Sequence, residues 1–418
     1  MDRRKFVLST AALATAGALT RPSLAKAQGS GPLRIGLLAP LTGVVAEGGR
    51  EMVNGFKMYW DQNGNEVAGR KVDIIVEDDG SNPDTSLQKA RRLVENQKVQ
   101  MLFGDLLANT GLAVANYVKG NGTPYFIPII AADELTQRHR IPNVIRVAGY
   151  SASQMPRPLA DWCLKQGYRR VATISQDYTF GHEQCGGFCQ TFTEGGGKVL
   201  AQLWHPINTS DFSPYIGQLA SLGVDVVFAM ETGSDATRLI QQYNNFGLKG
   251  KIPLVSAMNV TDQSVIRTMG AEAEGIVSAA QFAEGADNPK TQEFVREYSR
   301  RFNKLPSLYA FTMYSGAMWV KEALETVKGD AEDRKAFLKA VMDTRLTGSP
   351  LGKEVTLDAY GNPIYDVYIR KVEKRPDGKY WNVPITTYPG VSQFWHYDPE
   401  KYMQQKPYSR NFQGYSKS

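Results

Sequence analysis

Short runs of apolar residues recur along the chain, separated by segments with a helical pattern. Most runs are continuously apolar rather than alternating, which is typical of parallel strands buried on both faces. One intervening segment is Asp84–Asn96, whose Leu87, Ala90 and Val94 fall on one face of a helix. We therefore predict an α/β protein with doubly wound parallel sheets. The predicted strands are Arg34–Ala39, Val72–Asp79, Gln100–Asp105, Tyr125–Ile130, Val144–Ala148, Arg170–Gln176, Lys198–Trp204, Val224–Glu231, Ile252–Met258 and Gly275–Phe282.

The alternation of strand and helix starts again near residue 147, which predicts two domains. A chain of 418 residues is also too long for one ordinary core. Turn-rich breaks flank a helical block made of Tyr309–Lys328 and Glu332–Val341. From Tyr365 onward Tyr, Trp, Pro and Lys crowd the chain, which predicts a tail that wraps over a finished domain.

Residues 1–27 read as an export signal. Asp2-Arg3-Arg4-Lys5-Phe6 is a basic start, Val7–Leu19 is apolar, and Ala25-Lys26-Ala27 is an A-x-A cleavage site. The adjacent arginines resemble a twin-arginine signal, and an ordinary secretory signal is the alternative. The first cysteine is Cys163, so no cysteine near the cleavage site can carry a lipid. We expect a soluble periplasmic protein without a lipid anchor.

The predicted signal carries +4 of the formal net charge of +6, which leaves only about +2 on the mature chain. This charge disfavours nucleic acid as a partner. Cys163, Cys185 and Cys189 are an odd set: either two of them form one disulfide bridge, or all three are core residues. Their spacing is not CxxC and no histidine has an HxxxH partner, so we expect no metal site.

The opening turn, Pro40–Gly49, follows a predicted strand and precedes a helix, as a phosphate-binding loop does. Its glycines fit neither GxGxxG nor GxxxxGK[ST], and the chain contains no GxSxG or HExxH. We therefore expect neither a cofactor nor catalysis. The loops after the strands are rich in small and hydroxyl residues, which suits a small ligand held between two domains. They are Pro40–Gly49, Leu106–Gly111, Ala131–Glu134, Tyr178–Gly181, Thr232–Asp235 and Asn259–Asp262.

The chain as a whole resembles the solute-binding proteins of branched-chain amino-acid ABC transporters. The resemblance rests on RIGLLAPLTG, DDGSNPDTSLQKARRLV, ELTQR, IRVAGYSASQ, YTFGHE, QQYNNFGLKGK and GAEAEGIV, whose order and spacing cover nearly all of residues 33–370. It implies a type I periplasmic binding protein with two lobes joined by three crossings. Residues 33–147 and 283–362 would form one lobe, and 148–282 and 363–418 the other. The resemblance also implies a monomer that delivers a small organic ligand to a membrane ABC permease.

In that family, two loops hold the carboxylate of an amino acid. They correspond here to Leu107, Ala108, Asn109 and Thr110, and to Ile130, Ala131 and Ala132. The family's ammonium partner is a glutamate, and its position here is Met258, followed by Asn259. A buried ammonium without a carboxylate partner costs several kcal/mol. An amino acid is therefore disfavoured unless Asp262, Glu231 or Asp235 takes over.

The remaining departures favour a larger, apolar ligand. Gly48 stands where a tyrosine is common, and Phe180 and Phe311 take aromatic positions on the two lobes, with Tyr178 and Thr232 in the nearby loops. We expect an aromatic or otherwise hydrophobic carboxylic acid, such as a benzoate or a cinnamate. Three alternatives remain: an amino acid or amide receptor, an exported hydrolase, and a sensor partner of a membrane kinase.

Overall fold

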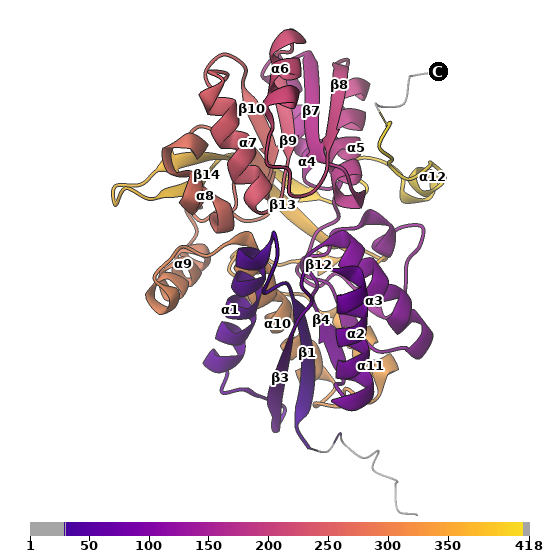
Figure 1. Ribbon diagram of the computed structural model, residues 1–418. Coiled ribbons are helices and arrows are strands. Elements are labelled where there is room, and N and C mark those ends of the chain that lie inside the picture. The colour runs from indigo at the N-terminus through magenta and orange to yellow at the C-terminus, as the bar shows by residue number, and fades with distance from the viewer. Residues whose placement is uncertain (1–28, 30, 413–418) are drawn as a thin grey trace, which may run out of the picture.

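The structure is a computed structural model that describes residue 29 and residues 31–412. The predicted signal, residues 1–27, lies outside the described residues. Two lobes stand one above the other, each built on a largely parallel β-sheet with helices on both faces (Figure 1). The predicted α/β class with two doubly wound sheets is confirmed.

The first lobe contains a six-stranded sheet in the order β2-β3-β1-β4-β5-β6. All its neighbouring strands are parallel except the short β2–β3 hairpin. Its strands are β1 (Leu33–Ala39), β2 (Glu66–Val67), β3 (Arg70–Asp78), β4 (Met101–Phe103), β5 (Tyr125–Phe126) and β6 (Val144–Ile145).

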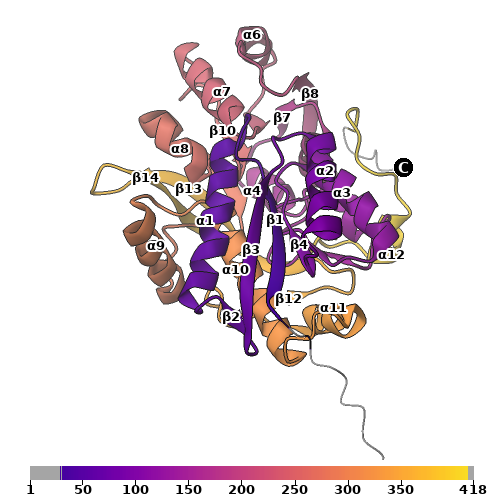
Figure 2. The ribbon, with the colours of Figure 1, turned by 60° about the horizontal axis from the view of Figure 1, so that its bottom comes forward.

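Helices cover both faces of this sheet: α1 lies on one side and α2 and α3 on the other (Figure 2). Helix α10 packs along α1 although more than 240 residues separate them in the sequence. The helices are α1 (Ala46–Gln62), α2 (Pro83–Arg91) with the π turn η1 (Arg92–Asn96), α3 (Ala108–Asn121), the 3-10 turn η2 (Asp133–Thr136), α9 (Pro289–Phe302), α10 (Leu308–Thr326) and α11 (Arg334–Asp343).

The second lobe contains an eight-stranded sheet in the order β12-β13-β11-β10-β9-β7-β8, with β14 paired to β13. Its strands are β7 (Arg170–Gln176), β8 (Lys198–His205), β9 (Val226–Met230), β10 (Leu254–Ala257), β11 (Val277–Ala280), β12 (Thr356–Leu357), β13 (Pro363–Lys374) and β14 (Tyr380–Val391). Its helices are α4 (Pro156–Lys165), α5 (Thr179–Glu194), α6 (Ser213–Ser221), α7 (Ser234–Asn245), α8 (Gln263–Met269), the 3-10 turn η3 (Gly270–Ala273) and α12 (Pro399–Met403).

The chain passes between the lobes three times: between β6 and α4, between β11 and α9, and between α11 and β13. The short strand β12 falls in the segment 283–362 that the sequence assigns to the first lobe, but it pairs with β13. The third passage therefore lies beside this strand pair. The residue limits of the two lobes stay a prediction.

The chain after Tyr365 differs from the predicted wrapping tail. Residues 363–391 are mostly strand: β13 pairs antiparallel with β11, and β14 pairs with β13. Side chains along β13 alternate between buried and half-buried, because one face of this hairpin packs on the lobe. Only the chain after β14 lies over the finished domain.

Arg157 fixes that last segment. Its side chain is fully buried on α4 and donates hydrogen bonds to the hydroxyl groups of Tyr402 (2.7 Å) and Tyr408 (2.9 Å) and to the carbonyl of Gln393. The rings of Tyr397 and Tyr402 also lie within 5.5 Å of its guanidinium. The cysteines beside this segment are core residues: Cys163, Cys185 and Cys189 are buried free thiols.

We predict that Arg157→Met lowers the free energy of unfolding by about 2–3 kcal/mol, because several buried acceptors lose a charged donor. Urea denaturation measures this change. Arg345→Met is the control, since it removes an exposed ion pair with Glu354 and should cost less than about 1 kcal/mol. Equal effects of the two substitutions would contradict the role of Arg157.

Candidate functional site

A small cavity lies at the boundary of the two lobes, beyond the carboxyl ends of the strands. Eight of its ten lining residues follow β4 and β5 in the first lobe or β7, β9 and β10 in the second; Tyr309 lies on α10, and Tyr150 lies in the crossing after β6. Loops and helix N-termini meet there, as expected for doubly wound sheets. The cavity is lined by Leu106, Ala108, Ile129, Ala131 and Tyr309 on one side and by Tyr150, Tyr178, Phe180, Thr232 and Asn259 on the other.

The cavity has four aromatic rings and no charged side chain among its ten lining residues. Its volume is about 10 Å³, room for about one water molecule. A ligand the size of a benzene ring can therefore enter only if the lobes separate. A larger hollow of about 700 Å³ lies between α1, α9 and α10 of the first lobe, but none of its lining residues belongs to the loops that line the cavity.

Helix α3 begins at this cavity with Ala108. No side chain caps the helix, and the Thr110 hydroxyl donates back to the carbonyl of Leu107 (2.7 Å). The N–H groups of a first helical turn have no acceptor within the helix and carry the positive end of its dipole. The start of α3 can therefore accept an anion. Asn109 has a buried Oδ1 without a hydrogen-bond partner in the part of the chain that the structure describes.

The neighbouring loop, Ile130–Ala132, is held from behind by Arg146. This fully buried guanidinium donates to the carbonyl oxygens of Ile130 (3.1 Å) and Ala132 (2.6 Å), and to Asn362 (2.8 Å). Only Ala131 of the three loop residues lines the cavity. Arg146 was not among the predicted site residues, and nothing near it in sequence marks its partners.

Two predicted site positions, Phe311 and Gly48, have different surroundings from those expected. Phe311 stacks on Phe282 with a centroid distance of 4.5 Å and does not line the cavity. Tyr309, two residues earlier, lines it instead. A Cβ at Gly48 would lie 3.0 Å from the Tyr309 ring, so the tyrosine fills the room that the glycine leaves.

The structure also places the predicted ammonium position away from the cavity. Met258 is buried, and its carbonyl accepts from Arg370 (3.1 Å); its neighbour Asn259 lines the cavity and donates to the Tyr309 hydroxyl (3.0 Å). The three acidic residues considered as substitutes, Asp262, Glu231 and Asp235, are absent from the lining.

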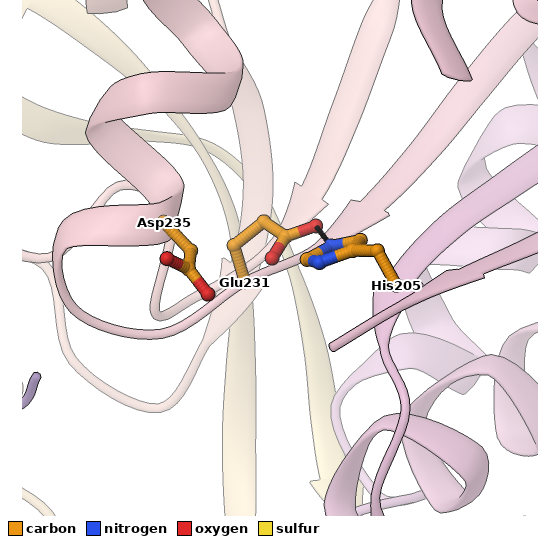
Figure 3. Close-up of side chains that lie close together, drawn as sticks. All are labelled: His205, Glu231 and Asp235. Carbon is orange, nitrogen blue, oxygen red and sulfur yellow. Dashed lines mark hydrogen bonds and ion pairs between the residues drawn. The ribbon is translucent and has the colours of Figure 1, made fainter. Parts of the chain in front are cut away.

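Each of those acids is occupied elsewhere. Asp262 caps α8 through Ser264 and accepts the N–H of Leu308 across the lobe boundary (2.7 Å). The other two lie with His205 behind Thr232, where Glu231 Oε1 is 2.8 Å from His205 Nε2 (Figure 3). Burial raises the pKa of Glu231 to about 7, although His205 opposes that shift.

His205, Glu231 and Asp235 offer nitrogen and oxygen atoms within 4.8 Å of one another, a spacing that a metal ion could use. The oxygens of Asp235, however, already accept from Gln176 (2.6 Å), the N–H of Asn208 (2.7 Å) and Arg238. The His205–Glu231 distance is that of a direct hydrogen bond. The cluster is therefore built as a hydrogen-bonded support for the cavity wall.

Further polar contacts join the lobes around the cavity. Arg267 of α8 forms ion pairs with Glu51 (2.7 Å) and Glu47 (3.1 Å) of α1. On the other flank, Glu183 of α5 accepts the N–H of Asp133 (3.1 Å). Burial and then the Asp133 carboxyl group raise the pKa of Glu183 well above its ordinary value, and Arg146 opposes this.

Two lobes that close on a cavity with binding groups on both walls define a two-lobed receptor for small molecules. The chain belongs to the periplasmic binding protein family, whose model matches residues 32–379. None of the helices in the described part of the chain is long and apolar enough to cross a membrane.

Three similar proteins illustrate the range of the family. Leu/Ile/Val-binding protein homolog 6 of Brucella melitensis is 27% identical over 365 residues, which cover 85% of this chain and 91% of the relative. A solute-binding protein of an ABC transporter from Rhodopseudomonas palustris BisB5, in complex with 3,4-dihydroxybenzoic acid, is 28% identical. Its TM-score is 0.82, with 87% of this chain and 98% of that chain covered. One from R. palustris in complex with benzoate is 26% identical, with a TM-score of 0.81 and the same coverage.

We predict that Glu183 makes stability fall with rising pH. Because the folded protein keeps a proton on Glu183 that the unfolded chain releases above about pH 4.5, each further pH unit costs up to about 1.4 kcal/mol until the raised pKa is reached. Urea denaturation between about pH 5 and pH 7 should show a shallower slope in Glu183→Gln. The same substitution at the exposed Glu293 should leave the slope of the wild type. A slope unchanged in Glu183→Gln would contradict this protonation.

Proposed function

We propose that this protein is the solute-binding component of an ABC importer and captures a small aromatic carboxylic acid between its lobes. The observation that carries the proposal is the cavity itself: four aromatic rings, an uncapped helix start and no acidic side chain among ten lining residues. An ionised carboxylate suits the N–H groups of α3. The rings of Tyr178 and Phe180 would cover one face of an aromatic ligand.

The same composition disfavours an α-amino acid. An ammonium group in this cavity would be buried without a carboxylate partner, at a cost of several kcal/mol. The similar solute-binding proteins that hold benzoate and 3,4-dihydroxybenzoic acid support an aromatic acid. The relative named for leucine, isoleucine and valine makes leucine the ligand to test against it.

The binding site in this proposal combines residues predicted from the sequence with two that were not. Helix α3 and the loop before η2 hold the anion, the second lobe covers the ring, and Gly48 gives space to Tyr309. The proposed site consists of Gly48, Leu107, Ala108, Asn109, Thr110, Ile130, Ala131, Ala132, Tyr150, Tyr178, Phe180, Thr232, Asn259 and Tyr309.

We further propose that the protein works in the cell as an exported carrier whose lobes open and close. A monomer is exported through the signal in residues 1–27, stays free of a lipid anchor, and delivers its ligand to a membrane permease without chemical change. The lobes, residues 33–147 with 283–362 and 148–282 with 363–412, move as two bodies about the three crossings, except that β12 stays with β13 in the second lobe. Opening of the lobes admits the ligand, and closure buries it.

We predict tight binding of 4-hydroxybenzoate or 4-coumarate and no response to leucine. Titration calorimetry on mature protein, unfolded and refolded to remove carried-over ligand, measures this directly. Incubation with the methyl ester of the acid, which a hydrolase would cleave and a receptor would leave intact, separates a receptor from an exported hydrolase. Tight leucine binding would overturn the proposed ligand class.

Closure should depend on the ion pairs of Arg267, which join the lobes outside the cavity. We predict that Arg267→Gln weakens binding of the aromatic acid up to about tenfold, because a partly buried ion pair then no longer favours the closed form. Calorimetry measures the dissociation constant. Arg300→Gln, which removes an exposed pair with Glu297 within α9, is the control and should bind like the wild type. Unchanged affinity in Arg267→Gln would show that closure does not use this contact.

A further inference from the structure

The cavity wall of the second lobe contains a chain of hydrogen bonds whose direction is fixed. Gln176, at the end of β7, is fully buried and uses its side-chain amide on both sides. Its Oε1 accepts from the N–H of Thr232 (3.1 Å) and from the Thr232 hydroxyl (2.7 Å). Its Nε2 donates to Asp235 Oδ2 (2.6 Å).

Both ends of the Gln176 side chain determine which way its amide points. A backbone N–H can only donate, so Gln176 Oε1 must face Thr232. Asp235 already accepts from the N–H of Asn208 (2.7 Å) and from Arg238, so it faces Gln176 as an acceptor too. The amide group cannot be reversed without breaking contacts on both sides.

The Thr232 hydroxyl group therefore donates its proton to Gln176 Oε1. Toward the cavity, which Thr232 lines, its Oγ1 has only its two lone pairs to offer. The Tyr178 hydroxyl, which lines the same cavity, hydrogen-bonds with Thr232 and takes one of them, which leaves one lone pair for a ligand. Behind it, Glu231 precedes Thr232 in the loop after β9, Asp235 lies in the first turn of α7, and His205 holds Glu231 from β8 (Figure 3). The wall consequently presents a fixed hydrogen-bond acceptor.

The same wall contains a second buried hydrogen-bond acceptor, on Asn259. Asn259 is only 3% exposed and lines the cavity, and its Nδ2 donates to the Tyr309 hydroxyl. Its Oδ1 is buried and has no hydrogen-bond partner among the described residues. A buried acceptor without a partner is costly, so a ligand that donates to it gains affinity.

We propose that the relay from Asp235 through Gln176 to Thr232 makes this receptor select acids that carry a hydrogen-bond donor, such as a ring hydroxyl, over equally sized acids that carry none. The inference rests on the proposed function, because it assumes an aromatic acid in this cavity. The carboxylate meets the start of α3 in the first lobe, and the ring hydroxyl donates its one proton to Thr232 in the second, beside Asn259. Gln176 and Asp235 are positioning residues, since neither lines the cavity.

The test compares ligands of nearly the same shape by titration calorimetry: 4-hydroxybenzoate with 4-fluorobenzoate, and 4-coumarate with 4-fluorocinnamate. Within the pair that binds better, we expect the hydroxylated acid to bind the wild type about tenfold more tightly than the fluorinated acid does. This factor corresponds to the free energy of one hydrogen bond. Thr232→Val should bring the two dissociation constants of that pair together. Thr232→Ser, which keeps the hydroxyl group, should restore the preference.

Thr173→Val is the matched control, because it makes the same substitution at a buried threonine on β7 that does not line the cavity. It should keep the preference of the wild type. Equal affinities of the two acids in the wild type, or a preference that survives Thr232→Val, would overturn the inference while leaving the aromatic-acid receptor intact. Binding of none of the four acids would overturn the proposed function itself.

Discussion

The carboxyl ends of two parallel sheets face each other across one boundary, and the remaining features of the site depend on this arrangement. Parallel strands all end on the same edge, so the loops after β4 and β5 meet the loops after β7, β9 and β10. Helix N-termini come to the same place because each helix follows its strand. The result is a boundary rich in N–H groups, closed so tightly around the cavity described above that only about 10 Å³ of it remains.

Each wall of the cavity is supported within its own half of the molecule. Arg146 holds the carbonyl groups of Ile130 and Ala132, and its further partner Asn362 lies just before β13. On the opposite side, Gln176 and Asp235 hold Thr232. Both half-sites are therefore arranged before the lobes meet, which reduces the ordering that a ligand must bring about on binding.

The sequence was a good guide to the parallel strands and a poor one to the hairpin that follows them. All ten predicted strands exist, because strands covered on both faces need unbroken apolar runs. Strands β13 and β14 carry Tyr, Lys and Pro among their apolar residues, since only one face packs on the lobe. Their composition therefore resembles that of an irregular tail.

The loops that form the site could be predicted from the sequence, but the side chains that face the cavity could not. Five of the six predicted loops, all except Pro40–Gly49, contribute residues to the cavity lining. On α10 the lining residue is Tyr309, whereas the predicted Phe311 packs on Phe282, because two positions on a helix lie about 200° apart. Composition alone does not reveal which face of α10 is directed toward the cavity. Gln176 and Arg146 were missed for another reason, because their partners Thr232 and Asn362 are 56 and 216 residues away.

The order of the strands has a consequence for synthesis of the chain. Strand β11 is the edge of the second sheet until β13 is made, and some 80 residues of the first lobe come between them. A ribosome that has just released α11 thus carries a lobe with an unpaired edge, a site where another unfinished copy could pair. The hairpin of β13 and β14, followed by the segment around Arg157, ends that exposure in one late step. The last fifty described residues thus complete a sheet whose first strand, β7, lies about two hundred residues earlier in the chain.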